Sequence, residues 1–303
     1  MSSHVRAFAL ALSLCILAAC GRPAAQLQPT PTPAAPSTPT PFGSPSPEAS
    51  PTPTAAHVFV IVMENHSFAQ AMSGPYTAKL AAKYPVATEY HAVTHPSLPN
   101  YLALTSGSTW GIADDGYHRL PAGGLGSQLT AAGVEWRAYM EGMSAGCFNS
   151  PYPYALKHNP FAYYGSGCPR QVVPFTHFAA DMNGEVPRLV WITPGLCHDG
   201  HDCATGVADR WLSQIVPKIL ATSAWQDNGL LLITWDEGVD RNNHVLTLVV
   251  HPHPMTRTSS AAYDHYSLLA TIEDRLGLPR LGHAVYARAM TDLLQSTQTQ
   301  SLG

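Results

Sequence analysis

Two uninterrupted apolar runs, each followed directly by polar residues, most constrain how this chain can fold. The run at 57–63 (HVFVIVM) leads into Glu64-Asn65-His66-Ser67, and the run at 230–235 (LLLITW) leads into Asp236-Glu237-Gly238. Continuous apolar runs of this length are typical of strands buried on both faces, which occur in parallel sheets covered by helices. We therefore expect an α/β fold with a mostly parallel central sheet flanked by helices.

Further strand and helix candidates alternate along the chain. Strands are expected at 86–93, 134–140, 189–193 and 245–250, and helices at 76–83, 98–104, 127–132, 209–220 and 266–276. This alternation predicts βαβ units and supports the mostly parallel sheet. The segment 141–176 is rich in Gly, Pro, Tyr and Cys, and we expect it to form an irregular lobe pinned by a disulfide.

The two polar clusters are expected to share one edge of the sheet. Ligands of open α/β sheets bind outside the carboxyl ends of the strands. Carboxylate and amide oxygens gathered there could converge on a hard cation. The candidate ligands are Glu64, Asn65, Asp236 and Glu237. A plain turn is the alternative for Asp236 and Glu237, and a helix cap is the alternative for Asn65. The pattern favours a metal-dependent hydrolase.

Ser97 is the candidate nucleophile. It lies at the junction between the strand at 86–93 and the helix at 98–104, where backbone N–H groups favour an anion. That position suits a serine that will carry a phosphoryl group, although a helix-capping role is the alternative. The Ser97 alkoxide would complete an all-oxygen ligand set suited to Ca²⁺, Mg²⁺ or Mn²⁺. Downstream, Asp114 and Asp115 are interpreted as a turn, with a substrate-facing role as the alternative.

The amino terminus predicts export. Arg6 precedes an apolar stretch at 7–19, which is too short to span a bilayer and suits a secretory signal. The stretch ends in a sequence that resembles the lipobox of bacterial lipoproteins, which would make Cys20 the lipidated first residue; an ordinary signal peptide is the alternative. We expect a signal peptide with lipobox at 1–20, a Pro/Thr-rich linker at 21–56 and a folded domain at 57–297. The protein would be extracytoplasmic, with a lipid anchor as its contact with the membrane.

Charge and cysteine content narrow the partners. A net charge of −4 with 12% charged residues provides no basic surface, so nucleic-acid binding is not expected. An exported location favours disulfides among the four cysteines of the folded region, which allow three pairings. We prefer nearest-neighbour pairing, Cys147 with Cys168 and Cys197 with Cys203. Zinc ligation by the second pair with nearby histidines is the alternative.

Five short motifs occur in an informative order. They are Glu64-Asn65-His66-Ser67-Phe68, His95-Pro96-Ser97-Leu98-Pro99-Asn100-Tyr101, Cys197-His198-Asp199-Gly200-His201-Asp202, Trp235-Asp236-Glu237-Gly238 and Asp264-His265-Tyr266-Ser267-Leu268-Leu269. Together they resemble the bacterial phosphoesterase family of acid phosphatases and non-haemolytic phospholipases C, within the alkaline-phosphatase-like superfamily. The resemblance spans about 57–278. It implies an alkaline-phosphatase-like fold and a hydrolase acting on phosphoric ester bonds.

The resemblance also implies roles for individual residues. Glu64 and Asn65 match the first pair of metal ligands, Asp236 and Glu237 match the second pair, and Ser97 occupies the nucleophile position. Catalytic contacts are expected from His198, His244 and His265, and second-metal or phosphate contacts from Asp199 and His201. Zn or Fe would be the cation if histidines ligate it.

The expected activity is that of an exported phosphomonoesterase of the acid-phosphatase type. A phosphoserine intermediate would form on Ser97, while histidines hold phosphoryl oxygens and protonate the leaving group. The alternatives are a phospholipase C or other phosphodiesterase with the same centre, and a non-catalytic surface binding lipoprotein. Gly195 stands where many relatives carry Asn, so one side-chain contact is expected to be missing. The chain is short beside the family's phospholipases C, which favours a compact phosphatase.

Overall fold

The computed structural model describes residues 56–165, 167–253 and 258–294. The expected signal peptide with Cys20, and all of the expected linker except Ala56, lie outside the described residues. Within the described ranges, no helix combines the length and apolar character needed to cross a membrane.

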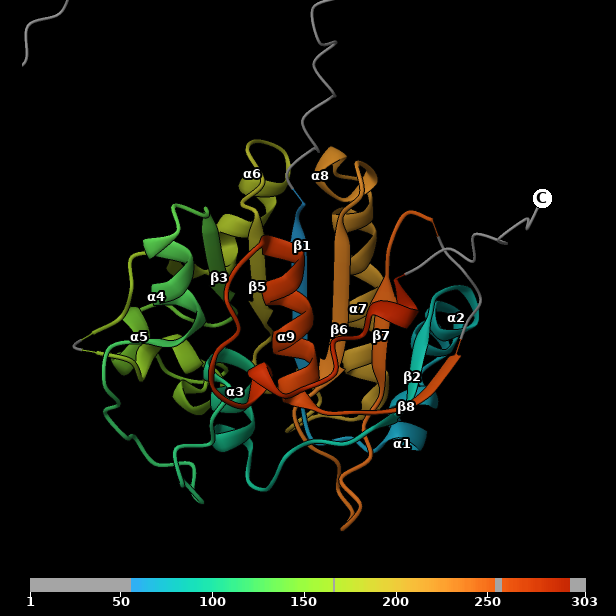
Figure 1. Ribbon diagram of the computed structural model, residues 1–303, viewed down its shortest axis with the longest axis horizontal. Helices are drawn as coiled ribbons and strands as arrows, with labels where there is room; N and C mark the ends of the chain where they lie inside the picture. The colour runs from blue at the N-terminus through green and yellow to red at the C-terminus, as the bar shows by residue number, and fades with distance from the viewer. Residues whose placement is uncertain (1–55, 166, 254–257, 295–303) are drawn as a thin grey trace, which may run out of the picture. The chain divides into compact units, whose positions relative to one another are not determined.

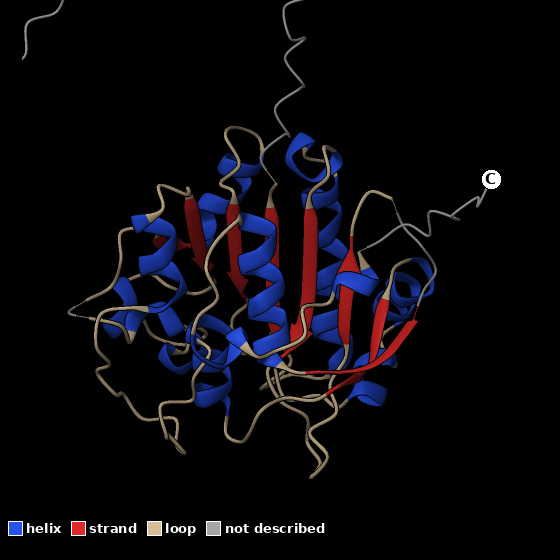
Figure 2. Cartoon of the chain, viewed as in Figure 1, coloured by secondary structure: helices blue, strands red, loops and turns tan. Residues whose placement is uncertain are grey.

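An eight-stranded sheet forms the centre of the domain, with helices packed on it (Figure 1 and Figure 2). The strands are β1 (Val58–Met63), β2 (Val86–Tyr90), β3 (Trp136–Met140), β4 (Val172–Pro174), β5 (Leu189–Thr193), β6 (Leu230–Trp235), β7 (Thr247–Val250) and β8 (Thr258–Tyr263). Their order is β4-β3-β5-β1-β6-β7-β2-β8. All neighbours are parallel except β7, which runs antiparallel to both β6 and β2. The expected α/β fold with a mostly parallel sheet is confirmed.

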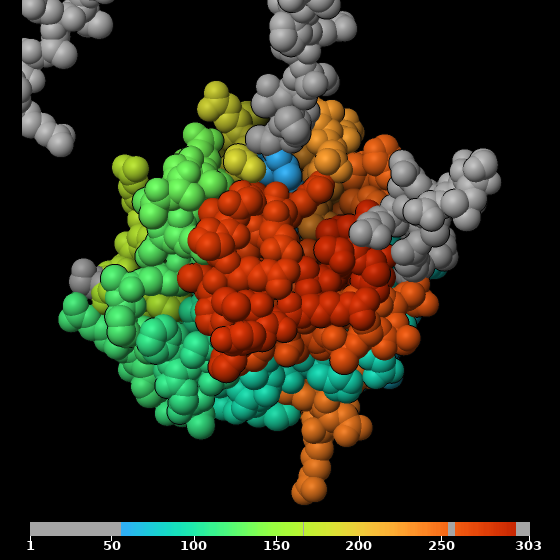
Figure 3. Space-filling model, in the orientation of Figure 1, coloured from blue at the N-terminus to red at the C-terminus, as the bar shows by residue number. Residues whose placement is uncertain are grey.

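Helices connect the strands and cover the sheet. They are α1 (Phe68–Met72), α2 (Pro75–Lys83), α3 (Ser97–Ser106), α4 (Gly124–Ala131), α5 (Gly146–Asn149), α6 (Phe178–Met182), α7 (Thr205–Leu220), α8 (Ser223–Gln226) and α9 (His265–Leu276), with a short 3₁₀ turn, η1 (Leu156–His158), in the irregular lobe. In Figure 1, α9 crosses in front of the sheet and α7 lies behind it. Figure 3 shows side chains of α9 and the segment after it covering the middle of that face.

The central strands place the two polar clusters side by side. Every residue of β1 and β6 is buried, which explains their unbroken apolar sequences. The two strands are parallel neighbours, and Met63 pairs with Trp235 at their carboxyl ends. Glu64 and Asp236 therefore leave the sheet next to each other.

Several element boundaries differ from the expected ones for local reasons. The strand expected at 86–93 ends at Tyr90, and beyond it the backbone N–H groups of Val93 and Thr94 donate to Asn100 Oδ1. Helix α7 begins at Thr205 instead of residue 209. The β8 strand was not expected at all, and its alternately exposed residues give no apolar run.

Both disulfides join nearest neighbours. Cys147 is bonded to Cys168, and Cys197 is bonded to Cys203. The alternative in which Cys197 and Cys203 bind zinc is wrong, because both sulfurs are used in the bridge. The second bridge closes the loop that carries His198, Asp199 and His201.

Candidate functional site

Ser97 lies among acidic side chains at the carboxyl edge of the sheet. Its Oγ atom is 3.2 Å from Glu64 Oε2 and 3.2 Å from Glu237 Oε1. The backbone N–H of Asn65 donates to Asp236 Oδ1 at 3.2 Å. Residues more than 170 positions apart in the sequence are thus brought into one cluster by the pairing of β1 with β6. All five residues expected to ligate a metal contact at least one other member of this cluster.

Two oxygens of this cluster have no hydrogen-bond partner among the described residues, although they are buried. They are Asn65 Oδ1 and Asp236 Oδ2. A buried polar atom without a partner is costly, and most such atoms in proteins have one. Carboxylate and amide oxygens are the donors that hard divalent cations bind. The donor set therefore fits a divalent cation.

The electrostatics of the cluster lead to the same interpretation. Burial, followed by the like charges of Asp236 and Asp199, raises the pKa of the Glu64 carboxyl well above its usual range. Burial and the like charge of Glu237 do the same to the pKa of Asp236. A cation between these carboxylates would offset both causes and keep them ionised at neutral pH.

The backbone at Asn65 explains how the first cluster turns toward the second. Asn65 has a φ of +45°, in the left-handed region that Asn tolerates better than most residues. This conformation ends β1 sharply and directs the Asn65 N–H toward Asp236. A β-branched residue at this position would strain the turn.

Glu64 is held from a second side by Tyr101. The Tyr101 hydroxyl donates to Glu64 Oε1 at 2.5 Å. Tyr101 lies four residues after Ser97 in α3, so both side chains lie on the same face of the helix. We did not predict this role, although the four-residue spacing in an expected helix was a usable signal.

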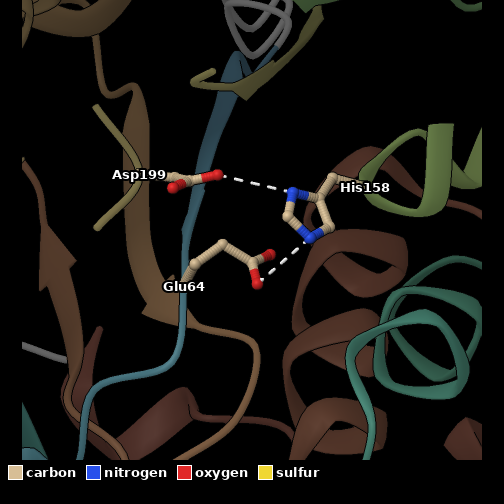
Figure 4. A group of neighbouring side chains, drawn as sticks. All are labelled: Glu64, His158 and Asp199. Atoms are coloured by element: carbon tan, nitrogen blue, oxygen red, sulfur yellow. Dashed lines mark ion pairs between the residues drawn. The ribbon is translucent and has the colours of Figure 1, made fainter. Parts of the chain in front are cut away.

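A second group joins Glu64 to the irregular lobe (Figure 4). His158 lies between two carboxylates, with Nε2 3.2 Å from Glu64 Oε2 and Nδ1 3.4 Å from Asp199 Oδ2. All three side chains are buried, and each offers one ligand atom within 4.8 Å of the others, an arrangement that could hold a metal ion. Burial raises the pKa of Asp199 to about 7 and lowers the pKa of His158 well below its usual value. His158 was missed because it lies in a segment with no periodic pattern.

His201 and Asp199 lie close together, as two residues of one disulfide-closed loop. The backbone N–H of His201 donates to Asp199 Oδ1 at 2.8 Å. The His201 ring contacts Asp202 Oδ1 through Nδ1 at 2.6 Å, and its Nε2 is 3.2 Å from Lys157 Nζ. His201 thus borders the group in Figure 4 from the lobe side.

The other predicted histidines lie around the cluster. His265 is fully buried, with Nε2 2.6 Å from the backbone oxygen of Asp236 and Nδ1 2.9 Å from Tyr90 Oη, so it positions the Asp236 backbone. The His244 Nε2 atom is 2.8 Å from the backbone oxygen of Thr88. His198 is half exposed, and its Nδ1 contacts the carboxylate of Glu141 at 3.0 Å.

A surface hollow of about 460 Å³ opens beside the cluster. It is lined by Asn65, His95, Glu237, Gly238, Val239, Asp240 and Arg241. The Nδ1 atom of His95 forms a close ion pair with Glu237 Oε2. His95 is the residue before the cis proline that leads into α3, and we did not assign it a role from the sequence. The hollow gives a ligand access to the metal-ligand candidates.

Sequence comparisons identify named relatives. The sequence profile of the Phosphoesterase family matches residues 70–279. The chain is 34% identical to a phosphatidylinositol-3-phosphatase of Mycobacterium tuberculosis over 251 residues, 78% of this chain and 82% of that protein. It is 31% identical to a phosphate-repressible acid phosphatase of Penicillium chrysogenum, over 73% of this chain. The match covers 59% of that fungal protein, so the chain spans less than two thirds of it.

Solved structures share the fold at low sequence identity. A Vibrio parahaemolyticus protein in the alkaline phosphatase superfamily aligns with a TM-score of 0.58 at 12% identity, over 78% of this chain and 70% of that one. The phosphonate monoester hydrolase of Agrobacterium radiobacter aligns with a TM-score of 0.55 at 13% identity, over 79% of this chain and 77% of that one. These matches confirm the alkaline-phosphatase-like fold.

Proposed function

Because this chain belongs to the Phosphoesterase family, whose named relatives hydrolyse phosphoric esters, we propose that it is a metal-dependent phosphomonoesterase of the acid-phosphatase type. Ser97 is the nucleophile of this proposal. The observation that supports it most directly is the 3.2 Å distance from Ser97 Oγ to two acidic side chains, beside buried oxygens that have no hydrogen-bond partner in the described part of the chain.

The proposed mechanism uses the geometry around Ser97. Glu64, Asn65, Asp236 and Glu237, with the Ser97 oxygen, would hold a divalent cation, which when bound lowers the pKa of the hydroxyl and offsets charge on the phosphoryl group. Ser97 Oγ forms a bond to phosphorus as the ester oxygen departs, and the hydroxyl proton passes to the adjacent carboxylate oxygens. Water then cleaves the phosphoserine and releases inorganic phosphate.

Histidines near the cluster support this chemistry in two ways. His95 borders the hollow and pairs with Glu237, so we assign it the protonation of the leaving alcohol. His265 acts through the Asp236 backbone as a positioning residue.

We also infer that His158 and Asp199 could hold a second cation with Glu64, and their nitrogen and oxygen donors suit Zn or Fe. His198 and His244 remain proposals without a contact to Ser97 among the described residues.

A phosphomonoester on an inositol lipid is a candidate substrate. The 34% identical relative from Mycobacterium tuberculosis is named a phosphatidylinositol-3-phosphatase.

We further infer that the protein is extracytoplasmic and is anchored by a lipid on Cys20. The two disulfides support an oxidising compartment, and labelled-lipid incorporation that is lost in Cys20→Ala would test the anchor.

Phosphate release from p-nitrophenyl phosphate tests the proposed function. We expect turnover with added Ca²⁺, Mg²⁺, Mn²⁺ or Zn²⁺, loss on chelation, and loss in Ser97→Ala. Ser127→Ala, on the exposed surface of α4, is the matched control and should retain activity. Preference for p-nitrophenyl phosphorylcholine over the monoester would favour the phosphodiesterase alternative. Full activity in Ser97→Ala would remove the nucleophile assignment, and no turnover with any metal would favour a binding lipoprotein.

A further inference from the structure

The backbone N–H that follows the proposed nucleophile donates to a carboxylate. Leu98, the second residue of α3, donates from its backbone nitrogen to Asp115 Oδ1 at 3.0 Å. The other carboxylate oxygen, Asp115 Oδ2, accepts from Lys157 Nζ at 2.9 Å. Asp115 comes from the irregular segment between α3 and α4, and Lys157 comes from η1. Two separate stretches of the chain therefore meet at the start of α3.

Leu98 N–H directly follows Ser97 at the start of α3, and Lys157 Nζ shares the Asp115 carboxylate with it. Backbone N–H groups at a helix amino terminus favour anions, and a lysine ammonium adds a full positive charge. Lys157 Nζ is also 3.2 Å from His201 Nε2, and the next residue, His158, has Nε2 3.2 Å from Glu64 Oε2, so Lys157 borders the cluster that contains Ser97. On the metal side of the same site, Asp236 Oδ2 is fully buried without a hydrogen-bond partner among the described residues.

The Asp115 carboxylate resembles part of a phosphoryl group in its contacts. It presents two negatively charged oxygens, and each accepts from a different donor. Its side chain is 31% exposed and that of Lys157 is 21% exposed, so the pair lies at the rim of the site and water can reach it. Ion pairs of this kind contribute little to stability, so a competing anion can replace one at low cost.

We propose that Leu98 N–H and Lys157 Nζ bind two non-bridging oxygens of the phosphoryl group, and that Asp115 occupies these donors until the substrate displaces it. The inference rests on the proposed function, since it extends the Ser97 site. It makes Lys157 a substrate-binding residue and Asp115 an internal competitor of phosphate. A competitor of this kind weakens the binding of the product as well as the substrate, and so favours release of inorganic phosphate.

Direct binding of inorganic phosphate to the metal-loaded protein tests this inference. Calorimetry should give a dissociation constant that falls roughly tenfold in Asp115→Asn, because the competing charge is removed. In Lys157→Met it should rise on the order of tenfold or more, and Lys157→Arg should restore part of the affinity. Asp114→Asn is the matched control, because that carboxylate is exposed and pairs with His118. Its dissociation constant should stay unchanged.

The KM for p-nitrophenyl phosphate should move with the phosphate affinity, while kcat changes less. A Lys157→Met protein that folds and binds phosphate as the wild type does would overturn the inference. So would an Asp115→Asn protein with weaker phosphate binding, or one with kcat lowered a hundredfold at constant KM, which would make Asp115 a proton donor. If Lys157→Met does not fold, Lys157→Arg and Asp115→Asn still decide the outcome. A wild type that binds phosphate without turnover would reject the proposed function and leave this test intact.

Discussion

The central sheet has a cavity where its strands begin, at the amino edge, and another where they end, at the carboxyl edge. The two cavities differ in size and in chemistry. The amino edge carries the larger cavity, about 840 Å³, whose lining includes Arg137, Arg170, Asp181 and Glu185. Arg137 and Asp181 are paired there: Arg137 donates to Asp181 at 2.7 Å, and Tyr139 donates to the same carboxylate at 2.7 Å. The carboxyl edge has a hollow of only about 460 Å³, but two buried oxygens beside it have no hydrogen-bond partner within residues 56–165, 167–253 and 258–294.

This difference indicates where ligand chemistry is concentrated. A large concave pocket is the usual first candidate for an active site. Here the stronger signal is a cluster of carboxylates whose pKa values are raised by burial and by one another. Volume alone would place the site at the amino edge, away from the proposed Ser97 site.

The largest expected effect comes from Asp236→Asn. The change removes a negative charge and a metal ligand, so we expect kcat/KM to fall about 10³-fold and metal affinity to fall with it. The metal-free protein should become more stable, because repulsion with Glu64 and Glu237 is reduced. Steady-state kinetics, metal titration and thermal unfolding measure these changes. Asp181→Asn at the amino edge is the matched control, and equal losses in both variants would remove the contrast between the edges.

A smaller effect is expected from removing the Cys197–Cys203 bridge. The double substitution Cys197→Ser/Cys203→Ser frees the loop that positions Asp199 and His201, and we expect kcat/KM to fall roughly 10–100-fold. Closing a loop of this size contributes about 2 kcal/mol to the free energy of unfolding. Kinetics and urea unfolding report the two effects separately. Unchanged kinetics with lowered stability would show that the loop holds its geometry without the bridge.

The third expectation concerns stability against pH in the metal-free protein. Asp199 has its pKa raised to about 7, and the pKa values of Glu64 and Asp236 are also raised, so the folded state holds protons that the unfolded state releases. Stability should therefore fall as pH rises above the unfolded values near 4. His158 and His265 have lowered pKa values and oppose this trend below about pH 6.5.

The clearest window for this measurement is thus pH 6.5–7.5. We expect the free energy of unfolding to fall there on the order of 1–3 kcal/mol with chelator present, and to fall less with saturating metal, which binds the deprotonated ligands. Urea unfolding at several pH values, with and without metal, measures both curves. Two identical, flat curves would contradict a metal centre built from these carboxylates.

The sequence was sufficient to predict the parts of the fold that are buried on both faces. Strands β5 and β6 begin and end at the expected residues, because a continuous apolar run marks both ends of such a strand. Strand β8 has alternately exposed, mostly small residues, so its pairing with β2 depends on the rest of the sheet. Local pattern was also insufficient to predict the end of β2 at Tyr90, beyond which Val93 donates to the Asn100 side chain of α3.

The same distinction applies to the candidate site: residues that follow buried strands were predictable, and residues of the irregular lobe were not. Glu64 and Asp236 were predictable, because each directly follows a buried strand and the carboxyl ends of parallel strands share an edge. Ser97 was expected at the start of a helix, and it is the first residue of α3. His158 and Lys157 were not, because the irregular lobe reaches the cluster through a tertiary contact in which the His158 ring stacks on Tyr101. No spacing in the sequence encodes that contact.

The smallest expected effect is at Arg137, and it tests the amino edge directly. Arg137→Met breaks the pair with Asp181, in which the two side chains are 40% and 20% exposed. Because solvent screens such a pair, the free energy of unfolding should change by no more than about 1 kcal/mol. We expect kcat/KM to stay within about twofold of the wild type, since neither Arg137 nor Asp181 belongs to the Ser97 cluster. A loss of activity comparable to that of Asp236→Asn would mean that the larger cavity takes part in catalysis, and that unpartnered charge is a poorer guide to the site than volume.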